Sequence, residues 1–270
     1  MDVKAVILCA GKGSRLCPLT PFIPKEMLPI AGFPTIHHVL AELNAAGIKK
    51  VMIVLSQGKE SVRAYCSDTI LPKGCIATEL SLERDRLLSE MEITFAEQKQ
   101  LLGTADAVYL ARDFMGKEPL LAVYPDDLLV LRGLKSKSQG IKQMLSLAHR
   151  GEKSVVLCEE IAPENASQYG VLHLGPAFEK DAFDVLDIAE KPKQYTENRA
   201  FVLVGRMILQ PQLVESIAEY PLNDGEGIIP MLRQSAKEKR LVACLLKEKR
   251  WDIGSHQGYQ DAVTALPNGT

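Results

Sequence analysis

The sequence predicts an α/β protein: a Rossmann-like, doubly wound mixed sheet, mostly parallel, in a single domain over residues 1–270. Two observations lead to this expectation. Short β-rich runs alternate with segments of helical period through the first half of the chain. A glycine-containing loop also follows the first strand directly, at the sheet edge where open α/β folds bind their ligands.

In the first half, strands are expected at 3–10, 50–55, 93–97 and 120–124, and helices at 35–46, 60–66, 82–91 and 105–112. The second half is less regular. Strands are expected at 154–159, 170–174, 182–188 and 201–209 with little helix between them, and another at 241–246. Helices are expected at 211–220, 228–239 and 257–266. We expect this half to extend the sheet and to supply a second binding pocket.

Composition narrows the class of protein. Hydrophobic residues make up 46% of the 270 and charged residues 24%, as in globular proteins. The formal net charge of −2 shows no sign of a nucleic-acid partner. None of the six cysteines forms a C-x-x-C pair or has a histidine at zinc-ligand spacing, so reduced thiols are expected. No stretch is long enough for a membrane span, and the opening apolar run is too short for a signal peptide; a cytoplasmic location is expected.

The loop after the first strand carries Gly11, Gly13 and Arg15. Glycines let backbone N–H groups approach a phosphate closely, and an arginine can fork onto phosphate oxygens. Leu16 stands where a dinucleotide fingerprint needs its third glycine, and the spacing does not fit a P-loop. A plain tight turn therefore remains an alternative.

A second segment, Pro24-Lys-Glu-Met-Leu-Pro29, strengthens the phosphate interpretation. Lys25 lies ten residues after Arg15 in a proline-stiffened loop that can fold back over the same strand end. Two cations that converge there would neutralise a triphosphate. The alternative is that Lys25 is a solvated loop charge.

Together these segments resemble the sugar-nucleotide pyrophosphorylases, a sugar nucleotidyltransferase family, and Ile23 to Pro29 is most similar to its bacterial UTP–glucose-1-phosphate uridylyltransferase branch. Further matching motifs follow in family order: Tyr124–Asp127, Gln168–Val171, Ala189–Lys193, Val204–Arg206 and Trp251–Gly254. The resemblance runs from Lys4 to about Ala262. It implies an enzyme that transfers a nucleotidyl group from UTP to α-D-glucose 1-phosphate, giving UDP-glucose and pyrophosphate. It also implies a nucleotide-binding half over 1–130 and a sugar-phosphate-binding half over 131–270.

The resemblance assigns nucleotide-binding roles. Backbone at Ala10, Gly11 and Gly13 would lie against the nucleotide, Arg15 and Lys25 would hold its phosphates, Gln98 would read the pyrimidine edge, and Gly103 would allow close approach to the base. The segment 103–107 is more similar to the ADP-glucose and GDP-mannose branches, so the identity of the base stays open.

For the metal, the resemblance implies Mg²⁺ held by Asp126 and Asp252. Magnesium takes one or two carboxylates plus substrate phosphates, so such a pair is reasonable. Asp126 is preferred to Asp127 because the family's metal aspartate directly follows the residue aligned with Pro125. The alternative is that either aspartate only caps the following turn.

For the sugar phosphate, the resemblance implies Glu190 on sugar hydroxyls and Lys191 on the phosphate, with Gly170, Val204 and Gly205 lining the pocket. An exposed Glu–Lys pair at a strand end is the alternative. Arg15, Lys25 and Lys191 are then the expected catalytic cations.

The expected mechanism needs no general base. A sugar phosphate has a second pKa of roughly 6 and is mostly dianionic at neutral pH. All five histidines lie outside the motifs and are expected on the surface or in helix packing. Two rival functions stay open: the same reaction with another nucleotide or sugar, giving ADP-glucose, dTDP-glucose or GDP-mannose, and a non-catalytic nucleotide-binding regulatory homologue. A homodimer also stays open, because related uridylyltransferases often carry extra C-terminal helices that join subunits.

Overall fold

The computed structural model describes residues 3–67, 78–129, 138–222 and 227–266, which fall into two compact units. The N-terminal unit comprises residues 4–99, 124–138 and 248–270, and the central unit comprises 1–3, 100–123 and 139–247. The two units are thus interleaved along the chain and do not coincide with its two halves. A single domain with halves 1–130 and 131–270 stays a prediction.

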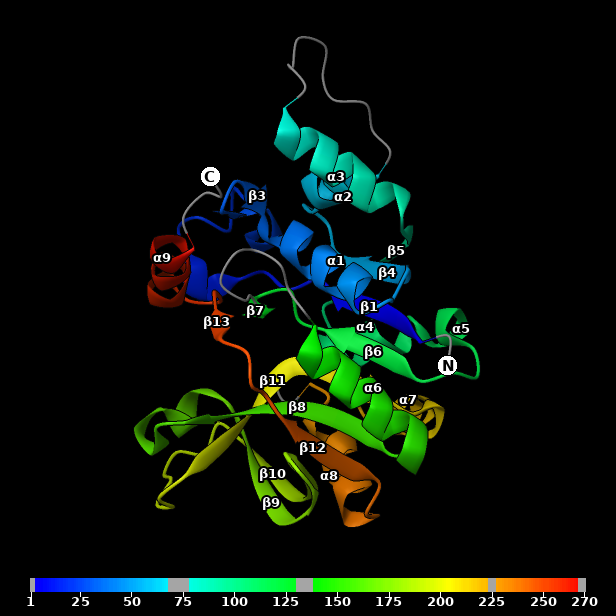
Figure 1. The fold of residues 1–270 in the computed structure, drawn as a ribbon, viewed down its shortest axis with the longest axis vertical. Coiled ribbons are helices and arrows are strands. Elements are labelled where there is room, and N and C mark those ends of the chain that lie inside the picture. The colour runs from blue at the N-terminus through cyan, green and yellow to red at the C-terminus, as the bar shows by residue number, and fades with distance from the viewer. Residues whose placement is uncertain (1–2, 68–77, 130–137, 223–226, 267–270) are drawn as a thin grey trace. The chain divides into compact units, whose positions relative to one another are not determined.

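The sheet of the N-terminal unit is parallel. Its strands β1 (Lys4–Leu8), β4 (Lys50–Leu55) and β5 (Glu92–Glu97) run in the order β5-β4-β1. The helices α1 (Thr35–Ala45), α2 (Glu60–Cys66) and α3 (Glu79–Ser89) lie together beside β4 and β5 in Figure 1. Parallel strands need such crossover helices, because a tight hairpin cannot join them.

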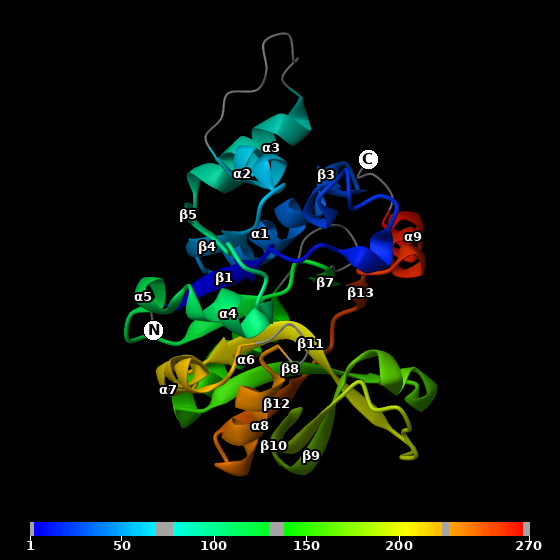
Figure 2. The ribbon, with the colours of Figure 1, turned by 180° about the vertical axis from the view of Figure 1, so that it is seen from behind.

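Smaller elements complete this unit. Two 3₁₀ turns, η1 (Ser14–Leu16) and η2 (Lys25–Met27), precede a short hairpin of β2 (Pro29–Ile30) and β3 (Phe33–Pro34). Farther along the chain, β7 (Asp127–Leu129) pairs antiparallel with β13 (Arg250–Asp252), and α9 (His256–Ala265) packs on β13, as Figure 2 shows from behind. The sequence did not predict the β7–β13 pair, because its strands are three residues each and far apart in the chain.

The central unit has a mixed sheet in the order β6-β11-β8-β12-β10-β9. Its strands are β6 (Leu120–Val123), β8 (Ser154–Ile161), β9 (Gly170–Glu179), β10 (Ala182–Glu190), β11 (Ala200–Leu209) and β12 (Leu241–Leu245). Only β8 and β12 pair in parallel here, whereas the other pairs recorded within this unit are antiparallel. The predicted α/β class and mixed sheet are confirmed, with the parallel pairing concentrated in the N-terminal unit.

Strand β11 changes neighbours along its length. Its first half pairs with β9 at Phe201 and Val202, and its second half pairs with β6 from Arg206 to Leu209. It also pairs with β8, with a shift of register between Leu203 and Met207. The strands β11, β8, β12, β10 and β9 therefore form a closed ring, which leaves β6 outside it.

Helices cover the strands of the central unit. They are α4 (Gly103–Tyr109), α5 (Arg112–Met115), α6 (Gln139–Gly151), α7 (Pro211–Ser216) and α8 (Ile229–Lys237), with 3₁₀ turns η3 (Pro163–Gln168) and η4 (Ile217–Glu219). Helix α6 was not predicted, although Ile141, Met144, Leu147 and Ala148 form the buried stripe of an amphipathic helix. It contacts β8, β11 and β12.

The described cysteines, Cys9, Cys17, Cys66, Cys158 and Cys244, are all free thiols, and Cys75 lies outside the described residues. Over the part of the chain that the structure describes, no helix has the length and apolar character required to cross a bilayer.

A buried aromatic and imidazole cluster ties α1 to α2 and α3. His37 is 3% exposed, stacks on Phe33 with 3.9 Å between ring centroids, and shares a 3.0 Å hydrogen bond with the Tyr65 hydroxyl. Arg84 of α3 donates to the backbone carbonyls of Tyr65 and Ser67. Burial, together with the positive charge of Arg84 and the neighbouring His38, lowers the pKa of His37 to about 3.

This depressed pKa predicts acid sensitivity. The unfolded His37 titrates near 6.5, so between pH 6.5 and pH 3 protons favour the unfolded chain and stability falls as the pH falls. A single group of this kind contributes a slope of up to about 1.4 kcal/mol per pH unit. Urea unfolding across this window should give a flatter pH dependence for His37→Gln than for the wild type. His149→Gln, at an exposed position in α6, should keep the wild-type slope.

Candidate active site

The loop after β1 presents backbone at its start. The buried Ala10 accepts a 2.8 Å hydrogen bond from the Ser56 hydroxyl through its carbonyl. Gly11 is exposed, and a Cβ built on it would have no neighbour within 4 Å. Protein packing therefore does not require a glycine at position 11, and the space above its backbone is open to a ligand.

Gly13 has a different reason to be glycine. Its φ of +69° lies in the left-handed region, and a Cβ there would come within 2.9 Å of the Thr20 side chain. The Thr20 hydroxyl donates to the Gly13 carbonyl at 2.8 Å, which closes the loop. Turn geometry alone accounts for this glycine, and its predicted contact with the nucleotide stays a prediction.

Lys25 and Asp126 form an ion pair in this loop region. Their Nζ and Oδ2 atoms are 2.7 Å apart, and both side chains are mostly buried. Burial acts to raise the pKa of Asp126, but the Lys25 ammonium, helped by Arg15, outweighs it and holds that pKa below its usual range. Burial likewise acts to lower the pKa of Lys25, yet Asp126 and Glu26 raise it above its usual value. Both groups are therefore charged at neutral pH.

Four of the predicted residues meet at Gly254, just after β13. A Cβ on Gly254 would lie 2.6 Å from Arg15 Nη2, 3.1 Å from Asp126 Oδ2 and 3.1 Å from Asp252 Oδ1. The backbone N–H of Gly254 donates to the same Asp252 oxygen at 3.0 Å. Since Lys25 is bonded to Asp126, the structure brings Arg15, Lys25, Asp126 and Asp252 together. A glycine is needed at 254 because any side chain would occupy the point on which these groups converge.

The carboxylates of Asp126 and Asp252 suit a metal ion that keeps coordination positions open for other ligands. Two carboxylate oxygens from distant segments converge, and among the described residues no cluster of three or more His, Cys, Asp or Glu could form a closed metal site. Magnesium is bound in this way, by one or two carboxylates plus substrate phosphates and water. Asp126 and Asp252 therefore fit the predicted metal, although the assignment stays a prediction.

The neighbouring Asp127 has a structural partner instead. It is buried in β7, and its Oδ1 accepts a 3.0 Å hydrogen bond from Arg250 Nη1 on β13. This geometry supports the preference for Asp126 over Asp127 as the metal-facing acid.

Helix α9 contributes residues that sequence reasoning missed. Ser255 caps it by accepting from the Gly258 N–H, and a Cβ on Gly258 would collide with the Asp252 carbonyl oxygen. The His256 ring bonds the Cys17 carbonyl at 2.7 Å, and the Tyr259 hydroxyl donates to the Pro29 carbonyl at 2.9 Å. The helix thus fixes Asp252 from one side and the loop carrying Arg15 and Lys25 from the other. Ser255, a residue type that often caps the start of a helix, was the available sequence signal for α9.

The expected base-reading residues belong to different units. Gln98 is 5% exposed, and its backbone N–H donates to the Leu55 carbonyl at the ends of β5 and β4. Gly103 opens α4 in the central unit with a φ of +86°, a conformation that favours glycine. Their joint contact with a base stays a prediction.

The expected sugar-phosphate residues meet in the central unit. Gly170 of β9 faces Glu190 of β10 across the ladder, and a Cβ on Gly170 would lie 3.1 Å from Glu190 Oε2. Lys191 follows with a φ of 43°, donates its N–H to the Tyr169 carbonyl at 3.0 Å, and places its exposed Nζ 3.3 Å from Glu190 Oε1. A positive φ is uncommon for lysine, and the N–H bond to Tyr169 accompanies it here.

Val204 and Gly205 lie in the irregular stretch of β11, between the two registers with which it pairs to β8. Such irregularities bend a strand and redirect its side chains, often beside active sites. Both residues are buried, and Leu203 next to them approaches Gly170. The ring of strands thus brings Gly170 and Glu190 together and places the stretch of β11 that contains Val204 and Gly205 beside Gly170.

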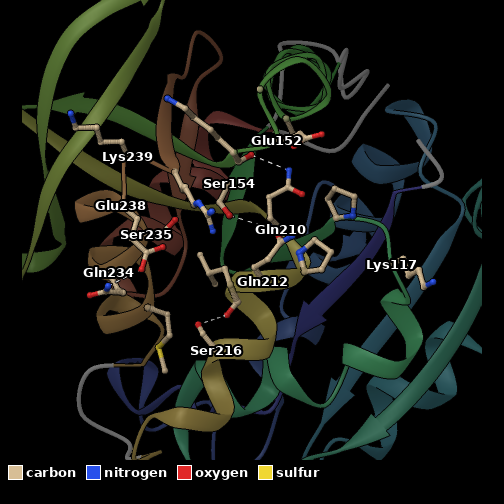
Figure 3. A pocket seen from close by; sticks show the side chains of 18 of the residues that line it. Lys117, Glu152, Ser154, Gln210, Gln212, Ser216, Gln234, Ser235, Glu238 and Lys239 are labelled. Carbon is tan, nitrogen blue, oxygen red and sulfur yellow. Dashed lines mark hydrogen bonds between the residues drawn. The ribbon is translucent and has the colours of Figure 1, made fainter.

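A cavity of about 870 Å³ in the central unit lies elsewhere. Figure 3 shows polar side chains around it, among them Ser154, Gln210 and Ser235, and none of the predicted site residues lines it. Among its cations, Lys153, Lys239 and Arg240 follow the C-terminal ends of α6 and α8, where positive charge complements the helix dipole, whereas Lys117 follows α5. Most of the positive charge around this cavity therefore has a structural explanation.

These features define a protein that gathers cations and paired carboxylates beside a parallel sheet, as handling of polyphosphates requires. Residues 4–269 match the model of the nucleotidyl transferase family, and the chain belongs to that family. The predicted resemblance and the expected class of activity, nucleotidyl transfer, are confirmed. Members of this family generally use a divalent metal.

Particular relatives match over almost their full length. The chain is 31% identical to the UTP–glucose-1-phosphate uridylyltransferase of Pseudomonas aeruginosa over 269 residues, which cover 97% of this chain and 95% of that protein. Among solved structures, it superposes on a UDP-glucose pyrophosphorylase complexed with UDP-glucose with a TM-score of 0.86 and 32% identity, covering 98% of both chains. A UTP-bound UGPase from Acinetobacter baumannii gives a TM-score of 0.81 at 25% identity, covering 98% and 93% of the two chains.

The role of α9 can be tested through Gly258. Gly258→Ala should destabilise the protein by about 1–3 kcal/mol, because the added methyl must displace the Asp252 backbone. Thermal and urea unfolding measure this loss. Gln260→Ala, at an exposed position on the same helix, is the control and should unfold like the wild type. Equal stability of the two variants would contradict the packing of Gly258 on Asp252.

Proposed function

We propose that this protein transfers the uridylyl group of UTP to α-D-glucose 1-phosphate, in a Mg²⁺-dependent reaction that yields UDP-glucose and pyrophosphate. The observation that carries this proposal is the convergence of Arg15, Lys25, Asp126 and Asp252 on one point. Full-length similarity to proteins named for this reaction supports the choice of substrates.

The chemistry requires positioning and charge rather than proton transfer. A sugar phosphate is mostly dianionic at neutral pH, so its oxygen can attack the α-phosphorus in line without a base and without a covalent enzyme intermediate. Arg15 and Lys25 would hold the β- and γ-phosphates, and Lys191 the incoming phosphate. Lys25 and Lys191 each pair with an acid in the structure, so binding a phosphate would exchange one anionic partner for another.

Asp126 and Asp252 would hold the magnesium ion, which when bound neutralises charge on the phosphates that must approach one another. The Lys25–Asp126 ion pair keeps the Asp126 carboxylate ionised and oriented before substrate arrives. The amide of Gln98 would read the pyrimidine edge, and Glu190 would accept hydrogen bonds from sugar hydroxyls.

Removal of the converging charges tests the mechanism. Lys25→Ala or Asp126→Ala should lower the rate of pyrophosphate release by about two orders of magnitude or more, because a charge-stabilising group is lost. Circular dichroism should show that both variants remain folded. Lys12→Ala removes an exposed cation from the same loop and should leave the rate nearly unchanged. Near-normal turnover by either site variant would refute its assigned role.

A panel of triphosphates tests the substrate. UTP, dTTP, ATP, GTP and CTP are each supplied with Mg²⁺ and glucose 1-phosphate, and UTP should give the fastest pyrophosphate release. The segment 103–107 makes the comparison with ATP and GTP informative, since it is similar to enzymes using those nucleotides. Preference for another triphosphate would keep the enzyme class and replace the substrate. Binding of UTP with no turnover of any triphosphate would instead favour a non-catalytic homologue.

A further inference from the structure

The strand pair β7–β13 places an unusual number of charges side by side. Asp127 and Asp252 stand directly opposite one another in its register, and Asp126 precedes Asp127 in the chain. Directly opposite residues of an antiparallel pair share one face, and like charges in that arrangement repel. Left to themselves, these acids would push apart the two strands that carry Asp126 and Asp252.

Arg250 lies on the same face. It precedes Asp252 by two residues on β13, and side chains two residues apart in a strand point to the same side. Its Nη1 reaches diagonally to Asp127 Oδ1 at 3.0 Å, and the Arg250 and Asp127 side chains are only 6% and 11% exposed. An ion pair this deeply buried costs desolvation, so its position beside the site calls for an explanation other than stability.

The surroundings hold the pair in place. Leu128 and Ile253 are 1% exposed, α1 packs on β7, and α9 packs on β13. The Ile253 N–H donates to the Asp126 carbonyl at 2.9 Å, which links the backbones of the two metal-facing segments directly. The separation of the Asp126 and Asp252 carboxylates is therefore set by how β7 and β13 pair.

We propose that Arg250 is a positioning residue of the active site: by holding the Asp127 carboxylate, it cancels the repulsion across β7–β13 and leaves Asp126 and Asp252 to converge on one cation. This role rests on the proposed function only in assigning the cation to nucleotidyl transfer. Arg250 itself touches neither substrate nor reacting atoms.

Two single variants disturb this balance in opposite senses. In Asp127→Asn the guanidinium loses a charged partner and turns to Asp252, two residues along on its own face, so it competes with the metal. In Arg250→Met the added cation is gone, and Asp127 becomes an extra acid beside the metal-facing pair. The double variant Asp127→Asn/Arg250→Met carries neither charge, and the two metal-facing carboxylates again have no competitor.

The test is binding of Mn²⁺ alone, followed by water-proton relaxation, with kcat and KM for UTP measured alongside. Asp127→Asn should weaken Mn²⁺ binding about tenfold, and the double variant should recover most of that loss, as residues coupled in one charge network do. Arg250→Met leaves the repulsion between Asp127 and Asp252 uncancelled, so it should also weaken Mn²⁺ binding and lower kcat about tenfold with little change in KM, and the double variant should recover most of both losses.

Two controls separate positioning from stability and from net charge. Arg84→Met removes another buried arginine of the same unit and should lower the melting temperature without changing Mn²⁺ binding. Asp261→Asn removes an equal charge from an exposed position on α9 and should also bind Mn²⁺ normally. Wild-type Mn²⁺ binding by folded Asp127→Asn, or a double variant no better than Asp127→Asn, would overturn the proposal. Since Mn²⁺ binding needs no substrate, failure of the uridylyl-transfer assignment would show separately, as absent turnover with intact metal binding.

Discussion

Mutual repulsion is the constraint on which this structure depends. In the proposed reaction two polyanions must meet, and the acids proposed to bind a metal for them repel one another as well. The N-terminal unit places cations beside two of its clustered acids: Lys25 bonds Asp126, and Arg250 bonds Asp127, the neighbour of Asp126 and the cross-strand partner of Asp252. The backbone supplies the rest, because Gly254 leaves free the point at which Arg15, Asp126 and Asp252 converge. Charge balance and close backbone approach are thus two parts of one solution.

The regular elements of the fold could be predicted because their signals are local. Residues 50–55 and 60–66 were predicted with the bounds of β4 and α2 as observed, and most other predicted elements match within a few residues. The pair β7–β13 could not be found in this way. Each strand is too short to show periodicity, and their pairing depends on a fold that brings residues more than a hundred positions apart together.

The site residues show the same difference between local signals, which a sequence carries, and contacts that depend on the fold. Side chains that bear charge, such as Lys25 and Asp252, stood out within motifs, and the structure brings those of the N-terminal unit together. For Gly13 the sequence left both a phosphate contact and a plain tight turn open; its positive φ and its closeness to Thr20 give it a turn-forming role, and the phosphate contact stays a prediction. His256 is exposed, as expected, and its ring in addition bonds the Cys17 carbonyl of the loop that carries Arg15. Contacts to backbone carbonyls leave no pattern in a single sequence.

The interleaving of the two units has a consequence for synthesis on the ribosome. The N-terminal unit begins to form with β1, yet β13 and α9 reach it only after the whole central unit has been translated. Until then, the nascent chain lacks Asp252 and the helix that steadies the loop around Cys17 and Pro29. A growing chain therefore cannot assemble the converging charges early, and its chemistry starts only when the last elements have emerged and docked.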